Sequence, residues 1–245
     1  MEWSDVPVPG RAAWYLHRNR FGSRAAPTRS AFPRTRLVCL ENTHNRGGGK
    51  IWSIEQIREV AAASRKHELQ LHLDGARLWN AAVATGIPER EYAALFDTVS
   101  VCFSKGLGAP VGSALVGSKA LIDRARRFRK MLGGGMRQAG IIAAGALFAL
   151  RHHRARLAED HANAKLLASG LAGIQGLEVN PIEVETNMVR FRVKTMPAEQ
   201  LVERLKAQGV LVLAVGRDTI RAVTNLMVSA DHIEQSVRIV FDSVK

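Results

Sequence analysis

Apolar positions between residues 37 and 116 alternate between two patterns. Short apolar runs, which are typical of buried strands, occur at residues 37–41, 69–73, 98–103 and 112–116. The segments between them carry apolar residues at helical spacing. One begins at Ser53, which forms a capping-box pattern with Gln56, and another covers residues 77–85. Strands that alternate with helices predict βαβ units and a mainly parallel sheet, in which a later strand can be antiparallel.

The pattern changes in the second half of the chain. Residues 118–172 are mainly helical, and an amphipathic helix is predicted over residues 160–171, ending at Gly173. Further strands are predicted at residues 177–179, 188–193, 210–213 and 220–223, and further helices at residues 198–208 and 231–243. The chain is therefore expected to be an α/β protein, with a partial large domain over residues 37–172 and a small C-terminal α/β domain over residues 173–245.

Residues 1–36 differ from the rest of the chain. They contain four of the eight prolines and seven arginines, and they show little periodicity. Such a composition favours irregular structure over a regular helix or strand. We interpret this stretch as an irregular N-terminal segment.

Composition narrows the class of protein. The 245 residues are 47% hydrophobic and 23% charged, which is ordinary for a globular protein. No run of apolar residues is long enough to span a membrane, and the first residues do not form a signal peptide. The two cysteines, Cys39 and Cys102, each lie in a strand-like run, so we expect both to be buried in the core. A reducing, cytoplasmic location follows as an expectation.

The net charge of +13 raises the hypothesis of a basic protein that binds nucleic acid. The basic residues are scattered, however, and no aromatic residues alternate with them in a stripe. No zinc-finger spacing is present either, and we expect no metal site. The charge pattern therefore favours a solvated basic surface and a small anionic ligand over nucleic acid.

A glycine-rich loop after the third predicted strand holds the first candidate for chemistry. Its sequence is Ser-Lys-Gly-Leu-Gly-Ala-Pro-Val-Gly, with the lysine at Lys105. A lysine directly after an apolar strand is expected to be partly desolvated, which favours the neutral, nucleophilic amine. The alternative from the residues alone is an exposed loop lysine.

Asp74 follows the second predicted strand, in Leu-His-Leu-Asp-Gly-Ala-Arg. The carboxyl end of a strand is where open α/β sheets bind ligands, and a carboxylate there suits a protonated ring nitrogen. Because a helix is predicted to follow, Asp74 could instead be a helix N-cap.

Two further polar segments flank these. Glu-Asn-Thr-His-Asn, which contains His44, follows the first predicted strand and could bind substrate or form a turn. Lys-Met-Leu-Gly-Gly-Gly-Met-Arg-Gln lies between helices and begins at Lys130, with Arg137 near its end. These cations suit a phosphate or carboxylate, and a flexible break between helices is the alternative.

Taken in order, the four segments resemble the threonine aldolase family, within the aspartate-aminotransferase-like enzymes that use pyridoxal 5′-phosphate (PLP). Glu-Thr-Asn at residues 185–187 and Arg-Ala-Val-Thr at residues 221–224 continue the resemblance, which covers the chain from about Phe32 to its end. The implied fold is that of the PLP-dependent transferases.

The resemblance implies a role for each matching residue. Lys105 is similar to the lysine that binds PLP covalently, and Asp74 to the partner of the pyridine nitrogen. Arg77 is similar to the residue beside the phenolic oxygen and the substrate. His44 is similar to a histidine near the substrate's β-hydroxyl, and Arg221 to the arginine that binds the substrate carboxylate. Two further positions, Lys130 and Arg137, are similar to cations that contribute to substrate binding near the active site.

The implied activity is cleavage of threonine, or a related β-hydroxy amino acid, to glycine and an aldehyde. The implied partners are a small-molecule amino acid and other copies of the chain in a homo-oligomer, a homotetramer by family resemblance, with neither nucleic acid nor membrane.

The family's phosphate-binding Gly-Thr loop and ring-stacking histidine have no counterpart in residues 1–31. The expectation is therefore a truncated chain, and the alternative is a natural variant that binds PLP through a different surface. The alternative function is a non-catalytic fragment that binds PLP weakly or not at all.

Overall fold

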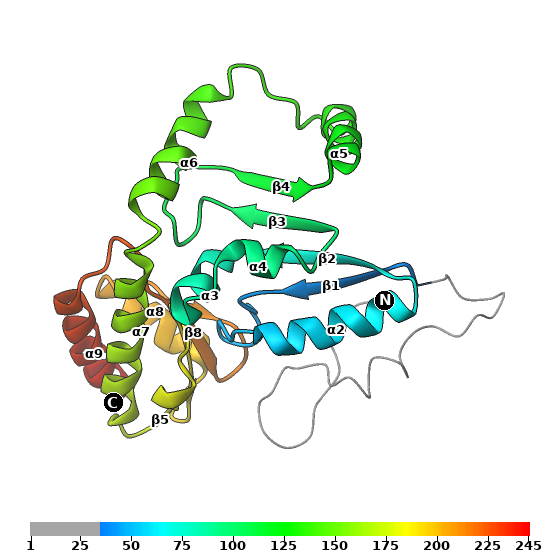
Figure 1. Ribbon diagram of the computed structural model, residues 1–245. Coiled ribbons are helices and arrows are strands. Elements are labelled where there is room, and N and C mark those ends of the chain that lie inside the picture. Colours follow the sequence, from blue (N-terminus) through cyan, green and yellow to red (C-terminus); the bar gives the residue numbers. More distant parts are fainter. Residues whose placement is uncertain (1–34) are drawn as a thin grey trace.

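The computed structural model describes residues 35–245, so the predicted irregular segment falls almost entirely outside the described residues. The described chain contains two separate four-stranded sheets (Figure 1). The first sheet has the order β1-β2-β3-β4. Its strands are β1 (Leu37–Glu41), β2 (Gln70–Gly75), β3 (Thr98–Cys102) and β4 (Ser113–Gly117).

The first three strands are parallel, and β4 is antiparallel to β3. The crossovers carry α2 (Ile54–Lys66), α3 (Leu78–Thr85) and the short α4 (Glu89–Ala93). Ser53 and Gln56 form the predicted capping box at the start of α2. The mainly parallel sheet is thereby confirmed. The carboxyl ends of its three parallel strands lie at the same edge of the sheet.

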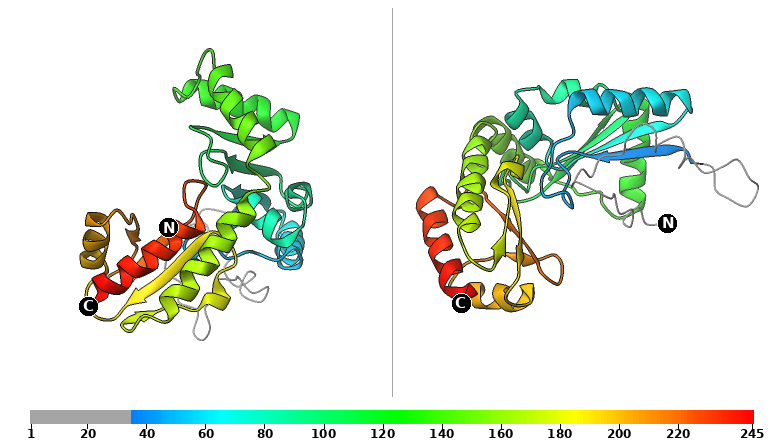
Figure 2. Two further views of the ribbon diagram at one scale, coloured as in Figure 1. Left: turned by 90° about the vertical axis from the view of Figure 1, so that its left-hand side faces the viewer. Right: turned by 90° about the horizontal axis from the view of Figure 1, so that it is seen from below.

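One face of the first sheet is covered by helices. Ile57 on α2, Leu73 on β2 and Tyr92 on α4 are fully buried in one apolar core. Figure 2 shows α2 lying along this face. Successive strand residues point to opposite faces, so alternate residues of β1, β2 and β3 lie on the other face and are only half-buried or exposed.

The alternation corrects the expectation for the cysteines. Cys39 is exposed and Cys102 is half-buried, so neither belongs to the core. Both point away from the helices, whereas their neighbours Leu40 and Val101 point toward them. A short apolar run does not reveal that only one of its two faces is covered.

Three helices follow the first sheet, as the helical pattern predicts: α5 (Lys119–Met131), α6 (Gly140–His152) and α7 (Leu157–Ala172). None of the residues of α5 is buried. Figure 1 shows α5 and most of α6 extending away from the rest of the chain. The large exposed side chains of β4, α5, α6 and the adjoining loops, here named the arm surface, are Val111, Leu115, Val116, Phe128, Met131, Leu132, Met136, Ile141, Leu147 and Phe148.

The second sheet has the order β5-β6-β8-β7 and is antiparallel. Its strands are β5 (Leu177–Glu178), β6 (Met188–Val193), β7 (Leu213–Ala214) and β8 (Thr219–Val223). A 3₁₀ turn (Pro181–Glu183) and the helices α8 (Ala198–Ala207) and α9 (Ala230–Val244) complete this part. These elements form the small α/β unit that the pattern predicts.

One face of the second sheet packs on helices α7, α8 and α9, which share its apolar core. Because α7 contributes Leu167 and Leu171 to this core, it packs with the residues that follow it. The predicted division at residue 173 stays a prediction. No helix among residues 35–245 is long and apolar enough to cross a membrane.

Candidate functional site

The predicted site residues that meet in the structure lie at the carboxyl ends of β1 and β2. Glu41 and Asp74 are register partners on these strands. The His44 Nε2 atom lies 3.6 Å from a carboxylate oxygen of Glu41, and an Arg77 Nη1 atom lies 4.0 Å from the other. Burial lowers the pKa of Arg77, the charges of Glu41 and Asp74 oppose that change, and the charge of Arg221 adds to it. Glu41, which sequence reasoning did not assign, therefore joins His44 to Arg77.

The backbone fixes the ring of His44. The Gly47 N–H donates to His44 Nδ1 at 2.9 Å, so Nδ1 is unprotonated and the neutral ring carries its proton on Nε2. A Cβ at Gly47 would lie 2.8 Å from Nδ1, so glycine is needed there. Burial lowers the pKa of His44, Glu41 raises it and Arg46 lowers it. The net effect favours a neutral imidazole whose Nε2–H can donate to a substrate oxygen.

Asp74 is oriented by a turn. Its Oδ1 atom accepts from the Ala76 N–H at 3.0 Å. The N-cap of α3 is Arg77, which makes no side-chain capping bond, so the alternative of Asp74 as a helix N-cap is wrong. The strand extends to Gly75 rather than ending near residue 73, and Asp74 therefore lies on the half-buried, helix-free face of the sheet.

Arg221 reaches this cluster from β8 of the second sheet. Its Nη1 atom donates to Asn45 Oδ1 at 2.7 Å. Its Nε atom is buried and has no hydrogen-bond partner among the described residues. An unpartnered buried donor is costly, and an anionic oxygen would satisfy it. The structure thus brings together His44, Asp74, Arg77 and Arg221.

Lys105 lies in the loop after β3. Because β3 runs parallel to β2, the loop leaves the same edge of the sheet that carries Asp74. The loop turns tightly, since the Gly108 N–H donates to the Lys105 carbonyl at 2.9 Å. The side chain is exposed and makes no hydrogen bond or ion pair with residues 35–245. The expected partial desolvation is wrong for this structure, which shows the alternative, an exposed loop lysine.

Lys130 and Arg137 lie outside the cluster. Lys130 is at the end of α5, Arg137 is in the following loop, and both are exposed. The Gly133 N–H donates to the Lys130 carbonyl, and Gly133 adopts a φ of 82°, a value that glycine favours. Within one chain, the glycines at residues 133–135 follow the end of α5. They bring neither Lys130 nor Arg137 to the other site residues.

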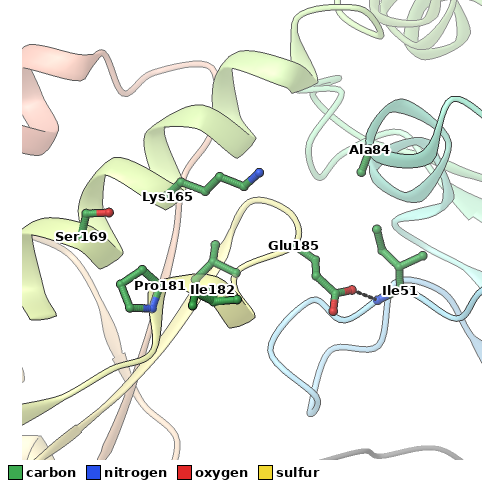
Figure 3. A pocket seen from close by; sticks show the side chains of 8 residues that line it. Ile51, Ala84, Lys165, Ser169, Pro181, Ile182 and Glu185 are labelled. Atoms are coloured by element: carbon green, nitrogen blue, oxygen red, sulfur yellow. Dashed lines mark hydrogen bonds between the residues drawn. The ribbon is translucent and has the colours of Figure 1, made fainter.

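A cavity of about 550 Å³ lies elsewhere, between α7 and the segment around Ile51 (Figure 3). None of the predicted site residues lines it. Glu185 at its border accepts from the Ile51 N–H at 2.8 Å and from Lys50 Nζ at 2.9 Å. This contact, which the sequence does not predict, ties the segment just before β6 to the loop that carries His44.

The residues at the sheet edge fit PLP in part. Lys105 supplies an amine and Asp74 a carboxylate from neighbouring strand ends, which is the donor set that an aldehyde and a pyridine nitrogen need. Beside them, the face of the sheet that points away from α2 and α4 is half-buried. No group of three or more metal-ligating side chains occurs among residues 35–245.

Comparison with known proteins gives a family match over most of the chain. The model of the family described as beta-eliminating lyase matches residues 5–194. The low-specificity L-threonine aldolase 1 of Arabidopsis thaliana is 43% identical over 209 residues, which is 84% of this chain. The chain spans 58% of the length of that relative.

Solved structures give the fold. A putative L-allo-threonine aldolase from Listeria monocytogenes is 22% identical, with a TM-score of 0.76 over 96% of this chain and 67% of that chain. The structure of SPT with PLP is 17% identical, with a TM-score of 0.69 over 93% of this chain and 58% of that chain. The fold is therefore that of the aspartate-aminotransferase-like, PLP-dependent enzymes, as the motifs implied.

Proposed function

The chain belongs to the beta-eliminating lyase family, and on this premise we propose that it is a PLP-dependent lyase that cleaves threonine or related β-hydroxy amino acids. The products are glycine and an aldehyde, which is acetaldehyde from threonine. One observation carries the proposal: His44, Asp74, Arg77 and Arg221, which come from three separate segments of the sequence, meet at the sheet edge that Lys105 follows.

Bound PLP would act as the electron sink for breaking the Cα–Cβ bond. The chain's own residues then have separate tasks. Lys105 holds the cofactor through its amine, and Asp74 keeps the ring nitrogen protonated because a carboxylate stabilises the adjacent positive charge. Arg221 holds the substrate carboxylate with its planar fork of donors.

His44 and Glu41 handle the β-hydroxyl. The His44 Nε2–H donates to the hydroxyl oxygen and orients it, since Nδ1 is already occupied by the Gly47 N–H. The Glu41 carboxylate, 3.6 Å from Nε2, is the acceptor for the hydroxyl proton. Arg77 restrains Glu41 from the other side.

The proposed activity is tested by incubating the purified chain with saturating PLP and L-threonine or L-allo-threonine. Glycine and acetaldehyde are expected in equal amounts, and Lys105→Ala should remove the activity. Lys119→Ala changes another exposed lysine, on α5, and serves as the matched control. Equal activity in the Lys105→Ala chain would contradict the assignment.

A second candidate is a non-catalytic chain that binds PLP weakly. The exposure of Lys105 favours it, because an uncovered amine gains little from a surrounding site. A PLP titration followed by absorbance separates the two. If the chain is saturated by PLP and releases glycine, the result supports the lyase. If PLP does not saturate the chain and no glycine is released, the result supports the second candidate.

We also propose that the chain works as a homo-oligomer, a homotetramer by resemblance, with Lys130 and Arg137 reaching the substrate or phosphate of a neighbouring copy. The exposed arm surface supports this proposal, because large exposed apolar patches mark interaction sites. The unpaired thiols of Cys39 and Cys102 are compatible with a cytoplasmic location.

A further inference from the structure

A second arginine stands beside the one assigned to the substrate carboxylate. Arg190 on β6 is the direct register partner of Arg221 on β8. Directly opposed residues of antiparallel strands project from the same face and lie within contact distance of each other. That face is turned toward the loop that carries His44, since both arginines make hydrogen bonds to it.

The loop holds both guanidinium groups in place. Arg190 Nη1 donates to the Arg46 carbonyl, and Arg221 Nη1 donates to Asn45 Oδ1 at 2.7 Å. Gly48 lets the loop approach, because a Cβ there would lie 3.1 Å from Arg190 Cδ. Arg190 is half-buried, and its guanidinium has further N–H donors besides the one that is bonded to the loop.

Neither arginine is neutralised. Within residues 35–245, no carboxylate forms an ion pair with Arg190 or Arg221. Two acidic side chains that contact this loop segment are engaged with other groups, Glu41 with His44 and Arg77, and Glu185 with Lys50. Burial and the charge of Arg221 both lower the pKa of Arg190. Opposed like charges are destabilising in a sheet, and a bound anion removes that penalty.

Two adjacent guanidinium groups can hold two separate anionic groups. Resting on the function proposed above, we propose that Arg190 binds a second anionic group of the substrate, so that the preferred substrates are β-hydroxy amino acids with a side-chain carboxylate, of the β-hydroxyaspartate class. Arg221 holds the α-carboxylate, and Arg190 holds the carboxylate on Cβ.

The same bonds break and form with this substrate as with threonine. The β-hydroxyl loses its proton, the Cα–Cβ bond breaks, and Cα gains a proton. β-Hydroxyaspartate thereby yields glycine and glyoxylate, with no oxidant or further reactant. A phosphate ion has similar chemistry and could also occupy the arginine pair, so the test includes it.

The test measures binding by calorimetry to the purified full chain, with and without PLP, for L-threonine, β-hydroxyaspartate and inorganic phosphate. We expect β-hydroxyaspartate to bind about tenfold more tightly than threonine, as one extra charge-assisted contact predicts. Arg190→Gln should remove most of this ratio, and Arg190→Lys should retain part of it. Arg238→Gln, which changes an exposed arginine on α9, is the control and should leave the ratio unchanged.

The outcomes separate the two proposals. Threonine binding that Arg221→Gln does not weaken contradicts the proposed function. Threonine binding that depends on Arg221, together with no preference for β-hydroxyaspartate, overturns only the role of Arg190. The role of Arg190 is also overturned if Arg190→Gln lowers the affinity for phosphate alone and leaves the affinities for both amino acids unchanged. Thermal melts that match the unchanged chain show that each variant is folded.

Discussion

At the scale of single residues, burial lowers the pKa of two histidines, His44 and His161. His44 is held neutral by burial at the site, and His161 on α7 is a second example away from it. His161 is 7% exposed, and its Nε2–H donates to Asn80 Oδ1 at 2.9 Å. Burial and the charge of Lys165 lower its pKa to about 4. This contact links α7 to α3, so its protonation matters for the packing of the two helices.

We predict an acid-dependent loss of stability at His161. Its pKa in the folded chain lies below the ordinary value of 6.5, so the unfolded chain binds the proton first as the pH falls. The contribution is complete above pH 6.5 and is lost progressively toward pH 4, by about 3 kcal/mol at most.

Denaturant unfolding of the chain and of His161→Gln between pH 4 and pH 7.5 measures this effect. The glutamine amide can still donate to Asn80, but it does not titrate. The free energy of unfolding should therefore fall less steeply with acid in the variant. Identical slopes in the two proteins would show that His161 does not have the lowered pKa.

At the scale of helices and strands, the sequence predicts what local pattern controls. The capping box at Ser53 and the parallel strands β1 to β3 follow from spacing alone. Sequence motifs also identify four residues that the structure brings together, which are His44, Asp74, Arg77 and Arg221. The exposure of Cys39 was not predicted, and that of Lys105 was only an alternative, because exposure depends on which faces and loops other segments cover. Arg190 was missed because a strand pattern does not name the partner across the sheet.

The loop that carries His44 depends on the second sheet for its shape. Gly49 adopts a φ of 79°, and a Cβ there would lie 2.6 Å from Thr186 Oγ1 and 3.0 Å from Met188 Cβ. Thr186 Oγ1 also donates to the Gly49 carbonyl at 2.8 Å. The loop and the strand β6 therefore fit closely only with glycine at this position.

Gly49→Ala should destabilise the chain more than Gly86→Ala does. Both glycines have positive φ, which costs alanine about 1–2 kcal/mol, but a Cβ at Gly86 meets nothing within 4 Å. The extra crowding at Gly49 should add about 1–3 kcal/mol. Chemical denaturation of both variants measures the difference, and equal losses would mean that the contact with β6 is loose.

At the scale of the whole molecule, the arm surface stands apart from both cores. Leu132 is 85% exposed and Ile141 is 83% exposed, although both are large apolar side chains. Figure 2 shows α5 and α6 projecting beyond the first sheet. A second copy of the chain that covers this surface would explain its composition and is the occupant proposed above.

Replacing Met131 and Leu132 together by glutamate should weaken self-association. Charges buried in an apolar interface lose their hydration, so the oligomer should dissociate at concentrations where the unchanged chain is assembled. Light scattering after size-exclusion chromatography measures the mass of each. Ile182→Glu, which changes another exposed apolar residue on the 3₁₀ turn, is the matched control. An unchanged mass in the double variant would exclude the arm surface as the interface.

We propose that Lys105 holds PLP at the edge of the sheet that carries Asp74. To test this attachment, the purified chain is incubated with PLP and reduced with borohydride, and the modified peptides are mapped by mass spectrometry. We expect a phosphopyridoxyl group on Lys105 in preference to the other lysines, and its loss in Lys105→Ala. Modification spread evenly over exposed lysines, or concentrated on a different one, would contradict it.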